Sequence, residues 1–230
     1  GAGATMSELI QHQIINSHFP SFKNFFHLIA SEQIRNMGTL AGNIVNASPI
    51  GDMTIFFLAL NSRIYLKNKQ GKTRSLYLKD FYQGYKTYNL NEKEGEFIEY
   101  ISFHLPSDNT HFNFEKVCKR TYLDIASVNT ALSVRVNDGY IEQAHIAIGG
   151  VAPIPKYLHQ TSTFLTGKPL NRASIKQAIN ILQNEIAPIS DVRGSSEYKR
   201  LLAQQLFTAH FTELFPATFQ LPHFLGKSYQ

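Results

Sequence analysis

The 230-residue sequence has a single cysteine, Cys118, and no long hydrophobic run. One cysteine excludes an intramolecular disulfide and a thiolate cage for zinc or an iron–sulfur cluster. The longest apolar run, Ile55 to Leu60, is far shorter than the roughly 20 residues that cross a bilayer. The first residues do not have the charged, apolar and small-residue layout of a secretory signal. We therefore expect a cytoplasmic protein that does not span a membrane.

Strong charge of either sign is also lacking, because the net charge is only +5. Five basic residues gather in RIYLKNKQGKTR (63–74), where Gly71 predicts the tip of a hairpin. A solvated turn is one interpretation of this cluster, and a phosphate-steering docking surface is the other. No helix-turn-helix, zinc finger or RNA-binding aromatic pair accompanies it, so we expect no nucleic-acid partner. The nine histidines show neither His-x-His nor His-Glu-x-x-His spacing, so the sequence predicts no metal site.

The hydrophobic pattern predicts an α+β protein, and the 43% apolar content is that of a folded chain. Thr5 and Glu8 form a capping-box pattern, which predicts that a helix starts at Met6. Asp52 is placed to cap a buried helix formed by MTIFFLAL. The helices expected in this part of the chain are 6–15, 21–30 and 53–60. The strands expected after them are 63–67, 73–78 and 97–105.

PSDNTH (106–111) is the linker expected between two domains. Beyond it, NDG at 137–139 predicts a hairpin, because Asp and Gly tolerate positive φ. Three strands are expected after the linker, at 112–120, 127–136 and 140–150. The helices expected after them are 157–165, 171–185 and 195–215. The sequence therefore predicts a domain at 1–107, a second domain at 111–215 with a three-stranded antiparallel sheet packed by helices, and a tail at 216–230.

IRNMGTLAGNIVNASPIGD (34–52) is unusually rich in glycine, asparagine and small hydroxyl residues. Glycines let a backbone approach a ligand closely, and successive free amides form a nest that attracts phosphate oxygens. Thr39 and Asn43 add neutral hydrogen-bonding groups, and the carboxylate of Asp52 suits a sugar or ring donor. These features predict a cradle for a nucleotide cofactor. An ordinary polar surface loop that ends in a helix cap is the alternative.

The order of residues in QIRNMGTLAGNIVNASPIGD (33–52) resembles the second flavin-contacting segment of the FAD domain in molybdenum hydroxylases, the xanthine dehydrogenase group. The chain departs from that family's pattern at Ala41, where the family carries a glycine. Other segments match in the family's order, namely FYQGYKTY (81–88), KVCKRTYLDIASV (116–128), IAIGGVAPIPK (146–156) and PISDVRGSSEYKRLLAQQL (188–206). The details most resemble the small subunit of bacterial two-subunit members, which carries iron–sulfur clusters and FAD.

The resemblance implies a specific architecture. It implies the second half of a two-lobed FAD-binding domain of the type-2, PCMH-like kind, followed by the family's C-terminal flavoprotein domain. The family carries its first flavin segment and its iron–sulfur cysteines upstream of these parts. We therefore expect this chain to be a fragment that binds FAD weakly or not at all by itself.

The resemblance also assigns roles position by position. It places Asp52 where the family has an FAD-contacting aspartate, Ile98 where an aliphatic residue packs on the isoalloxazine ring, and Lys116 where a lysine hydrogen-bonds the ring edge. The full set of cofactor contacts that it implies is Ile29, Ala30, Thr39, Leu40, Ala41, Gly42, Asn43, Asp52, Ile98 and Lys116.

Three further residues have roles by resemblance. Tyr85 and Asp124 fall on the nicotinamide side of the flavin, with a packed aromatic residue and a strand-end cap as the alternatives. Arg35 is expected to tether a neighbouring carboxylate. No side chain of this chain is expected to act as a nucleophile or a general base, and no metal ligand is expected.

The function implied is the electron-transfer part of a molybdenum hydroxylase, most closely a xanthine dehydrogenase of purine catabolism. A molybdopterin-binding large subunit would oxidise xanthine or hypoxanthine, and an upstream iron–sulfur domain would pass the electrons to FAD and then to NAD⁺. This implies a hetero-oligomer. The alternatives are the FAD subunit of an enzyme for carbon monoxide, nicotinate or aromatic acyl-CoA, and a non-catalytic assembly subunit or paralogue that has lost FAD.

Overall fold

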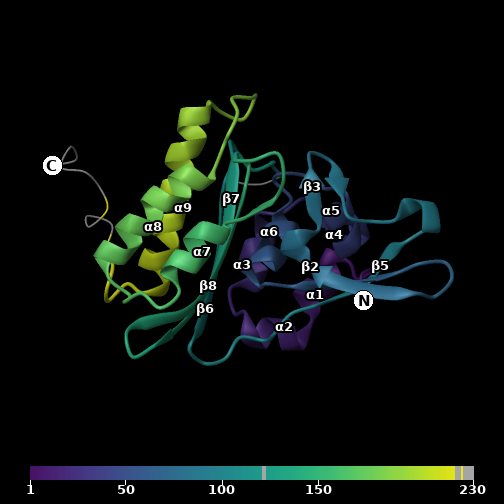
Figure 1. Cartoon of the computed structure of the whole chain (residues 1–230), viewed down its shortest axis with the longest axis horizontal. Helices are drawn as coiled ribbons and strands as arrows, with labels where there is room; N and C mark the ends of the chain where they lie inside the picture. The colour runs from purple at the N-terminus through teal and green to yellow at the C-terminus, as the bar shows by residue number, and fades with distance from the viewer. Residues whose placement is uncertain (121–122, 221–223, 225–230) are drawn as a thin grey trace.

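A computed structural model describes residues 1–120, 123–220 and 224 of the chain. It shows an α+β protein with a helix-rich N-terminal half, a small sheet at one side, and a second sheet near the middle of the molecule (Figure 1). The α+β prediction is confirmed. Among the described residues, none of the helices combines the length and the apolar content that crossing a bilayer requires.

The N-terminal half contains six short helices. They are α1 (Met6–Gln11), α2 (Gln13–His18), α3 (Phe22–His27), α4 (Glu32–Met37), α5 (Leu40–Val45) and α6 (Asp52–Ala59). The capping box of Thr5 and Glu8 is confirmed at the start of α1. The single helix predicted over 6–15 is instead two helices that meet at His12, whose backbone is extended at φ −71° and ψ 116°. The Asn16 side chain donates to the carbonyl of Ile10 at 2.6 Å and so satisfies an acceptor that a continuous helix would pair with a backbone amide.

The glycine-rich stretch is more regular than the predicted open loop. Ser31 caps α4 and Thr39 caps α5, each by accepting a hydrogen bond from a backbone amide in the first helical turn. The prediction that Asp52 caps α6 is wrong, because Gly51 is the N-cap and Asp52 is the first helical residue. The carboxylate is thereby free to bond outside its own helix. Every residue from Met53 to Leu60 is buried, so α6 is a core helix.

The small sheet has the order β2-β1-β5 and is antiparallel throughout. Its strands are β1 (Arg63–Lys67), β2 (Thr73–Tyr77) and β5 (Phe97–Ser102), so the strand predicted over 97–105 ends three residues early. Gly71, at φ 82°, lies in the turn between β1 and β2, as predicted. The segment between β2 and β5 contains the 3-10 helices η1 (Leu78–Asp80) and η2 (Glu92–Glu94) and the short strands β3 (Tyr82–Gly84) and β4 (Thr87–Tyr88).

The larger sheet has the antiparallel order β6-β7-β8-β9. The three predicted strands are present as β6 (Thr110–Val117), β7 (Val128–Asn137) and β8 (Tyr140–Gly149), although β6 starts two residues before and ends three residues before the predicted 112–120. The two-residue β9 (Lys156–Tyr157) extends the sheet beside β8. Asp138 and Gly139 both have positive φ in the β7–β8 turn, as the hairpin prediction requires.

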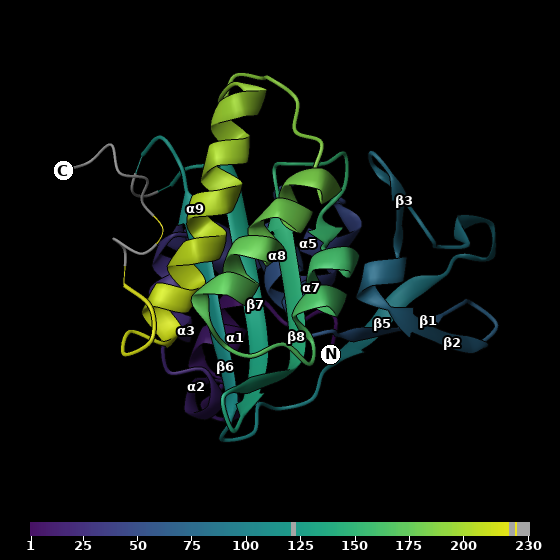
Figure 2. The same ribbon diagram turned by 60° about the vertical axis from the view of Figure 1, so that its left-hand side comes forward.

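Helices cover both faces of this sheet. On one face lie α7 (His159–Leu165), α8 (Arg172–Glu185) and α9 (Ser196–Leu214), with α9 against β6 and β7 and α7 against β8 (Figure 2). On the other face α6 contacts β7 and β8, so the N-terminal half packs directly on the sheet of the C-terminal half. Burial on both faces explains why β7 is an almost unbroken run of buried residues. Of the predicted tail, residues 221–223 and 225–230 lie outside the described residues, and Phe219 is buried in the C-terminal core.

A buried histidine joins α9 to the sheet. His210 is fully buried, with Nδ1 3.1 Å from Asn113 Nδ2 and Nε2 3.2 Å from Thr130 Oγ1. Thr130 Oγ1 in turn donates to the carbonyl of Ala147 at 3.0 Å. This series of hydrogen bonds is complete when Nδ1 accepts from Asn113 and Nε2–H donates to Thr130, which requires the neutral imidazole. Burial lowers the pKa of His210 to about 3.

We expect the free energy of unfolding to fall as the pH drops from about 6.5 towards 3. The unfolded chain takes up a proton on this imidazole at about pH 6.5, whereas the folded protein resists protonation until its lower pKa is reached, so acid favours the unfolded state. Urea unfolding from pH 7 to pH 4 measures the effect. His210→Gln should flatten this part of the pH profile, and His104→Gln, at an exposed position, should leave it unchanged. An identical pH slope in the wild type and His210→Gln would contradict the assignment.

Candidate functional site

Two of the predicted cofactor contacts meet where the two halves of the chain join. Asp52, at the start of α6, and Lys116, on β6, lie 64 positions apart in the sequence, yet Lys116 Nζ is 2.8 Å from Asp52 Oδ2. The side chain of Lys116 is 1% exposed and that of Asp52 is 13% exposed. Lys116 Nζ also donates to the carbonyl of Leu28 at 2.6 Å. The pair therefore ties β6 to both α6 and the loop that follows α3.

Asn129, on β7, completes the surroundings of this carboxylate. Its Nδ2 donates to Asp52 Oδ1 at 2.6 Å, so each carboxylate oxygen has its own donor. Burial raises the pKa of Asp52, and the charge and hydrogen bond of Lys116 and the hydrogen bond of Asn129 oppose that rise. Sequence reasoning missed Asn129. The available signal was a lone amide at the second position of the largely apolar strand pattern VNTALSV, which requires a buried partner that the sequence does not identify.

The loop at Ile29 and Ala30 is held by Arg35. Its Nη1 donates to the carbonyls of Ile29 at 2.8 Å and Ala30 at 2.7 Å. The prediction that Arg35 tethers a carboxylate is therefore wrong, because its partners are backbone carbonyls. Ala30 adopts φ 51°, in the left-handed region, and the guanidinium fixes this bend. Arg35 and Lys116 together satisfy three successive carbonyls, those of residues 28–30.

The turn at Thr39–Asn43 does not offer the predicted nest of free amides. The amides of Leu40 and Ala41 donate to the carbonyls of Ala4 and Ala2, at 2.9 and 3.0 Å. The amides of Gly42 and Asn43 donate to the side-chain and main-chain oxygens of Thr39. The prediction is wrong because Thr39 starts a helix and the N-terminal segment pairs with the turn. Cofactor contacts by these five residues stay a prediction, which now depends on their exposed surface rather than on free amides.

The remaining predicted residues occupy different settings. Ile98 is buried on β5, where it pairs with Leu66, and its packing on a flavin ring stays a prediction. Asp124 accepts hydrogen bonds from the amides of Arg120 and Ile125, as a cap of its own loop. Tyr85 is 65% exposed and lines a cleft.

That cleft lies between the two halves of the chain and has a volume of about 470 Å³. One wall is the segment Ser48–Ile50 together with Tyr85, and the other includes Gly150, Pro153 and Ile189. Its polar lining comes from Lys86, Ser127, Arg193 and the ion pair of Lys199 with Asp191, whose Nζ and Oδ1 atoms are 2.8 Å apart. The lining of the cleft is therefore more apolar than polar, and its cations Lys86, Arg193 and Lys199 outnumber the single carboxylate of Asp191.

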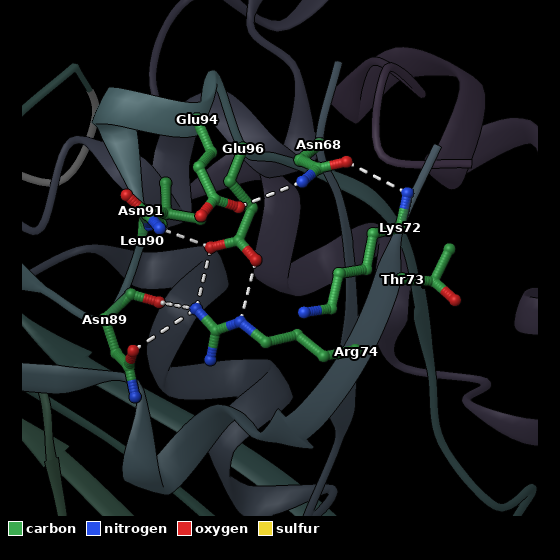
Figure 3. Close-up of a pocket in the computed structure, with 9 residues that line it drawn as sticks. All are labelled: Asn68, Lys72, Thr73, Arg74, Asn89, Leu90, Asn91, Glu94 and Glu96. Atoms are coloured by element: carbon green, nitrogen blue, oxygen red, sulfur yellow. Dashed lines mark hydrogen bonds and ion pairs between the residues drawn. The ribbon is translucent and has the colours of Figure 1, made fainter. Parts of the chain in front are cut away.

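A second hollow, of about 450 Å³, lies beside β2 and η2 (Figure 3). Arg74 makes two hydrogen bonds of 2.7 Å to the carboxylate of Glu96, which also accepts from the amide of Asn91. Asn68 Nδ2 donates to Glu94 at 3.0 Å. The hydrogen bonds of Arg74 hold the pKa of Glu96 below its usual value. These groups satisfy one another across the hollow, and it contains none of the predicted cofactor residues, so we interpret it as a structural polar seam.

Comparison with known proteins identifies the family. Residues 1–107 match the FAD-binding domain in molybdopterin dehydrogenase, and residues 114–214 match the CO dehydrogenase flavoprotein C-terminal domain. The chain is 32% identical over 214 residues to the glyceraldehyde dehydrogenase medium chain of Sulfolobus acidocaldarius, covering 93% of this chain and 74% of that protein. It is 28% identical over 217 residues to the nicotinate dehydrogenase FAD-subunit of Eubacterium barkeri, covering 93% and 73%.

A solved structure shares the fold as well. A carbon monoxide dehydrogenase from Hydrogenophaga pseudoflava superposes with a TM-score of 0.86 at 25% identity, over 95% of this chain and 75% of that one. The fold and the matched domains define a flavoprotein component of an oxidoreductase. The chain belongs to the family of FAD-binding domains of the molybdopterin dehydrogenases, the molybdenum hydroxylases. The resemblance seen in the sequence is confirmed.

The residues of the junction can be compared with the chemistry of FAD. A flavin ring presents carbonyl oxygens and an N–H along one edge, and the carboxylate of Asp52 can accept a hydrogen bond from that N–H. The side chain of Asp52 is 13% exposed, whereas that of Lys116 is 1% exposed and its Nζ already donates to Asp52 and to the carbonyl of Leu28. The amides of residues 40–43 are committed within the chain and are not free to bind a pyrophosphate. The described residues therefore fit the flavin end of FAD, and its phosphates require other contacts.

We expect Lys116→Met to lower the free energy of unfolding by about 3–5 kcal/mol, because it leaves the Asp52 carboxylate buried without its cation. Lys67→Met breaks an exposed ion pair with Glu99 and should cost less than about 1 kcal/mol. Chemical denaturation at pH 7 measures both values. Equal, small losses for the two variants would show that the buried pair does not hold the junction together.

Proposed function

We propose that this chain is the FAD-carrying electron-transfer part of a molybdenum hydroxylase. The observation that carries the proposal is the meeting of Asp52 and Lys116, because the resemblance assigns both to the flavin and the fold brings them from separate domains to 2.8 Å. The order of the two matched family domains gives independent support. The protein would act in the cytoplasm with a molybdopterin-binding large subunit and an iron–sulfur domain, as a hetero-oligomer.

FAD, when bound, supplies the redox chemistry, and the chain's residues hold and tune it. Asp52 would accept a hydrogen bond from the ring edge. Lys116 neutralises that carboxylate, so the ring edge would meet a paired acid rather than an isolated negative charge, which would oppose reduction of the ring. Arg35 keeps the Ile29–Ala30 bend rigid beside this site. These contacts position the cofactor, and none of them requires a nucleophile or general base.

We further propose NAD⁺ as the electron acceptor, in the cleft that Tyr85 lines. An apolar cleft of about 470 Å³ with cations at its margin suits a nicotinamide ring followed by a pyrophosphate. Tyr85 is placed to contact such a ligand. Asp124 caps its own loop, so the geometry supports Tyr85 and gives no support to Asp124 on this side.

The oxidised substrate is proposed from the sequence details alone. The sequence details favour xanthine or hypoxanthine, and this purine assignment remains a prediction. The similar proteins named above carry the names of glyceraldehyde, nicotinate and carbon monoxide dehydrogenases, so the FAD module accompanies several substrates. The substrate would be selected on the molybdopterin-binding subunit, and xanthine is the first one to assay.

The complete polypeptide that carries this chain should show the absorbance of oxidised flavin, and Asp52→Ala should release most of the FAD. Asp80→Ala, which removes an exposed carboxylate on η1, should retain it. FAD content after gel filtration measures the effect. A colourless wild-type protein that binds no added FAD would contradict the proposal and favour the non-catalytic paralogue.

Tyr85→Ala should weaken NADH binding by about tenfold while FAD content stays unchanged, because a stacked aromatic contributes on the order of 1 kcal/mol or more. Tyr140→Ala removes another exposed tyrosine, at the start of β8, and serves as the matched control. Fluorescence titration with NADH gives the dissociation constants. Equal affinities for NADH in the wild type and Tyr85→Ala would rule out this cleft as the site of the electron acceptor.

A further inference from the structure

Asn129 is a fully buried amide whose side chain leaves its own sheet to reach the N-terminal half. Its Nδ2 donates to Asp52 Oδ1 at 2.6 Å and to the carbonyl of Ile50 at 3.2 Å. Its Oδ1 is buried and has no hydrogen-bond partner among the described residues. An unsatisfied buried oxygen is costly, so a purely structural role would not favour asparagine here.

The strand register explains why Asn129 and Lys116 act on the same group. Lys116 on β6 is directly opposite Asn129 on β7, and Asn129 is directly opposite Gly149 on β8. Opposite residues of antiparallel strands share a face of the sheet. The two side chains therefore project together towards α6, where Lys116 binds Asp52 Oδ2 and Asn129 binds Oδ1. One donor on each oxygen fixes the plane of the carboxylate.

Gly149 leaves the space that this arrangement needs. A Cβ atom at Gly149 would lie 2.1 Å from Asn129 Oδ1 and 2.8 Å from the carbonyl oxygen of Pro49. The next residue, Gly150, has φ 84° and donates its amide to that same carbonyl at 3.0 Å. The absence of side chains at the end of β8 lets the segment that leads into α6 approach the sheet.

We propose that Asn129 is a positioning residue that fixes the Asp52 carboxylate for the flavin, and that Gly149 provides the room it requires. This inference rests on the proposed FAD function. A neutral donor suits the task because a second cation would overcompensate the single charge of Asp52. Holding the acceptor in one orientation lowers the cost of binding a ligand that must meet it in that orientation.

The test compares Asn129→Leu, which removes the donor at similar volume, with Thr130→Val. The control variant removes two neighbouring buried hydrogen bonds, one to the carbonyl of Ala147 and one from His210, neither of which reaches Asp52. FAD dissociation constants are measured for the complete polypeptide. Asn129→Leu should raise the constant by about tenfold or more, the effect of losing a hydrogen bond to a charged group. Thr130→Val should change it by less than about twofold.

A second readout does not depend on FAD. Carboxyl NMR of this chain without cofactor follows the titration of Asp52, whose charged neighbour is Lys116 and whose titratable neighbour is the thiol of Cys118. Loss of a donor to the carboxylate should raise the pKa of Asp52 in Asn129→Leu and leave it unchanged in Thr130→Val. If the wild type binds no FAD, the proposed function fails. The titration still decides whether the hydrogen bond from Asn129 holds the carboxylate of Asp52.

A double-mutant cycle covers the case in which Asn129→Leu does not fold. Asn129→Ala and Gly149→Ala should each weaken FAD binding, and the double variant should lose less than the sum, because the closest clash at Gly149 is with the removed amide. A folded Asn129→Leu or Asn129→Ala protein with wild-type FAD affinity and an unchanged Asp52 titration overturns the proposal. Fully additive losses in the cycle overturn the part assigned to Gly149.

Discussion

The buried ion pair of Asp52 and Lys116 is the interaction on which the junction of the two domains depends. Removing two charges from water is expensive, and a well-packed apolar pair at such a site is often equally stable or more stable. The fold nevertheless surrounds this pair with further hydrogen bonds, from Asn129 to the carboxylate and from Lys116 to the carbonyl of Leu28. Stability alone does not explain why so many polar groups are buried at this junction. A cofactor that needs a hydrogen-bond acceptor with a positive charge nearby explains it.

The central sheet makes the pair possible by packing differently on its two faces. Ala131 and Ala147, which are opposite each other on β7 and β8, belong to the core shared with α6, whereas Leu132 and Ile146 belong to the core shared with the C-terminal helices. Small side chains on the first face let α6 approach the strands closely. Asp52 stands at the first position of that helix, so the same close approach brings its carboxylate within reach of the sheet.

Local sequence patterns predicted the elements well and the site only in part. The capping box at Thr5, the hairpin at 137–139 and the strands around it follow from short-range rules, and all are present. The open amide nest failed because the acceptors for Leu40 and Ala41 come from residues 2–4, a pairing that no local pattern specifies. Asp52 and Lys116 were found through resemblance to a family. Asn129 was missed because its contact with Asp52 depends on the register of three strands.

The arrangement also accounts for how one module can accompany enzymes with different names. The polar groups at the junction surround a carboxylate that would touch the cofactor, and the cleft beside Tyr85 is the site we propose for the electron acceptor. Neither group of residues would contact the molecule oxidised at a molybdenum centre. The constraint on this chain is therefore to hold a flavin and set its charge environment, which does not change with the substrate. On this argument the residues to compare among family members are Asp52, Lys116 and Asn129 for the cofactor, and the lining of the cleft for the acceptor.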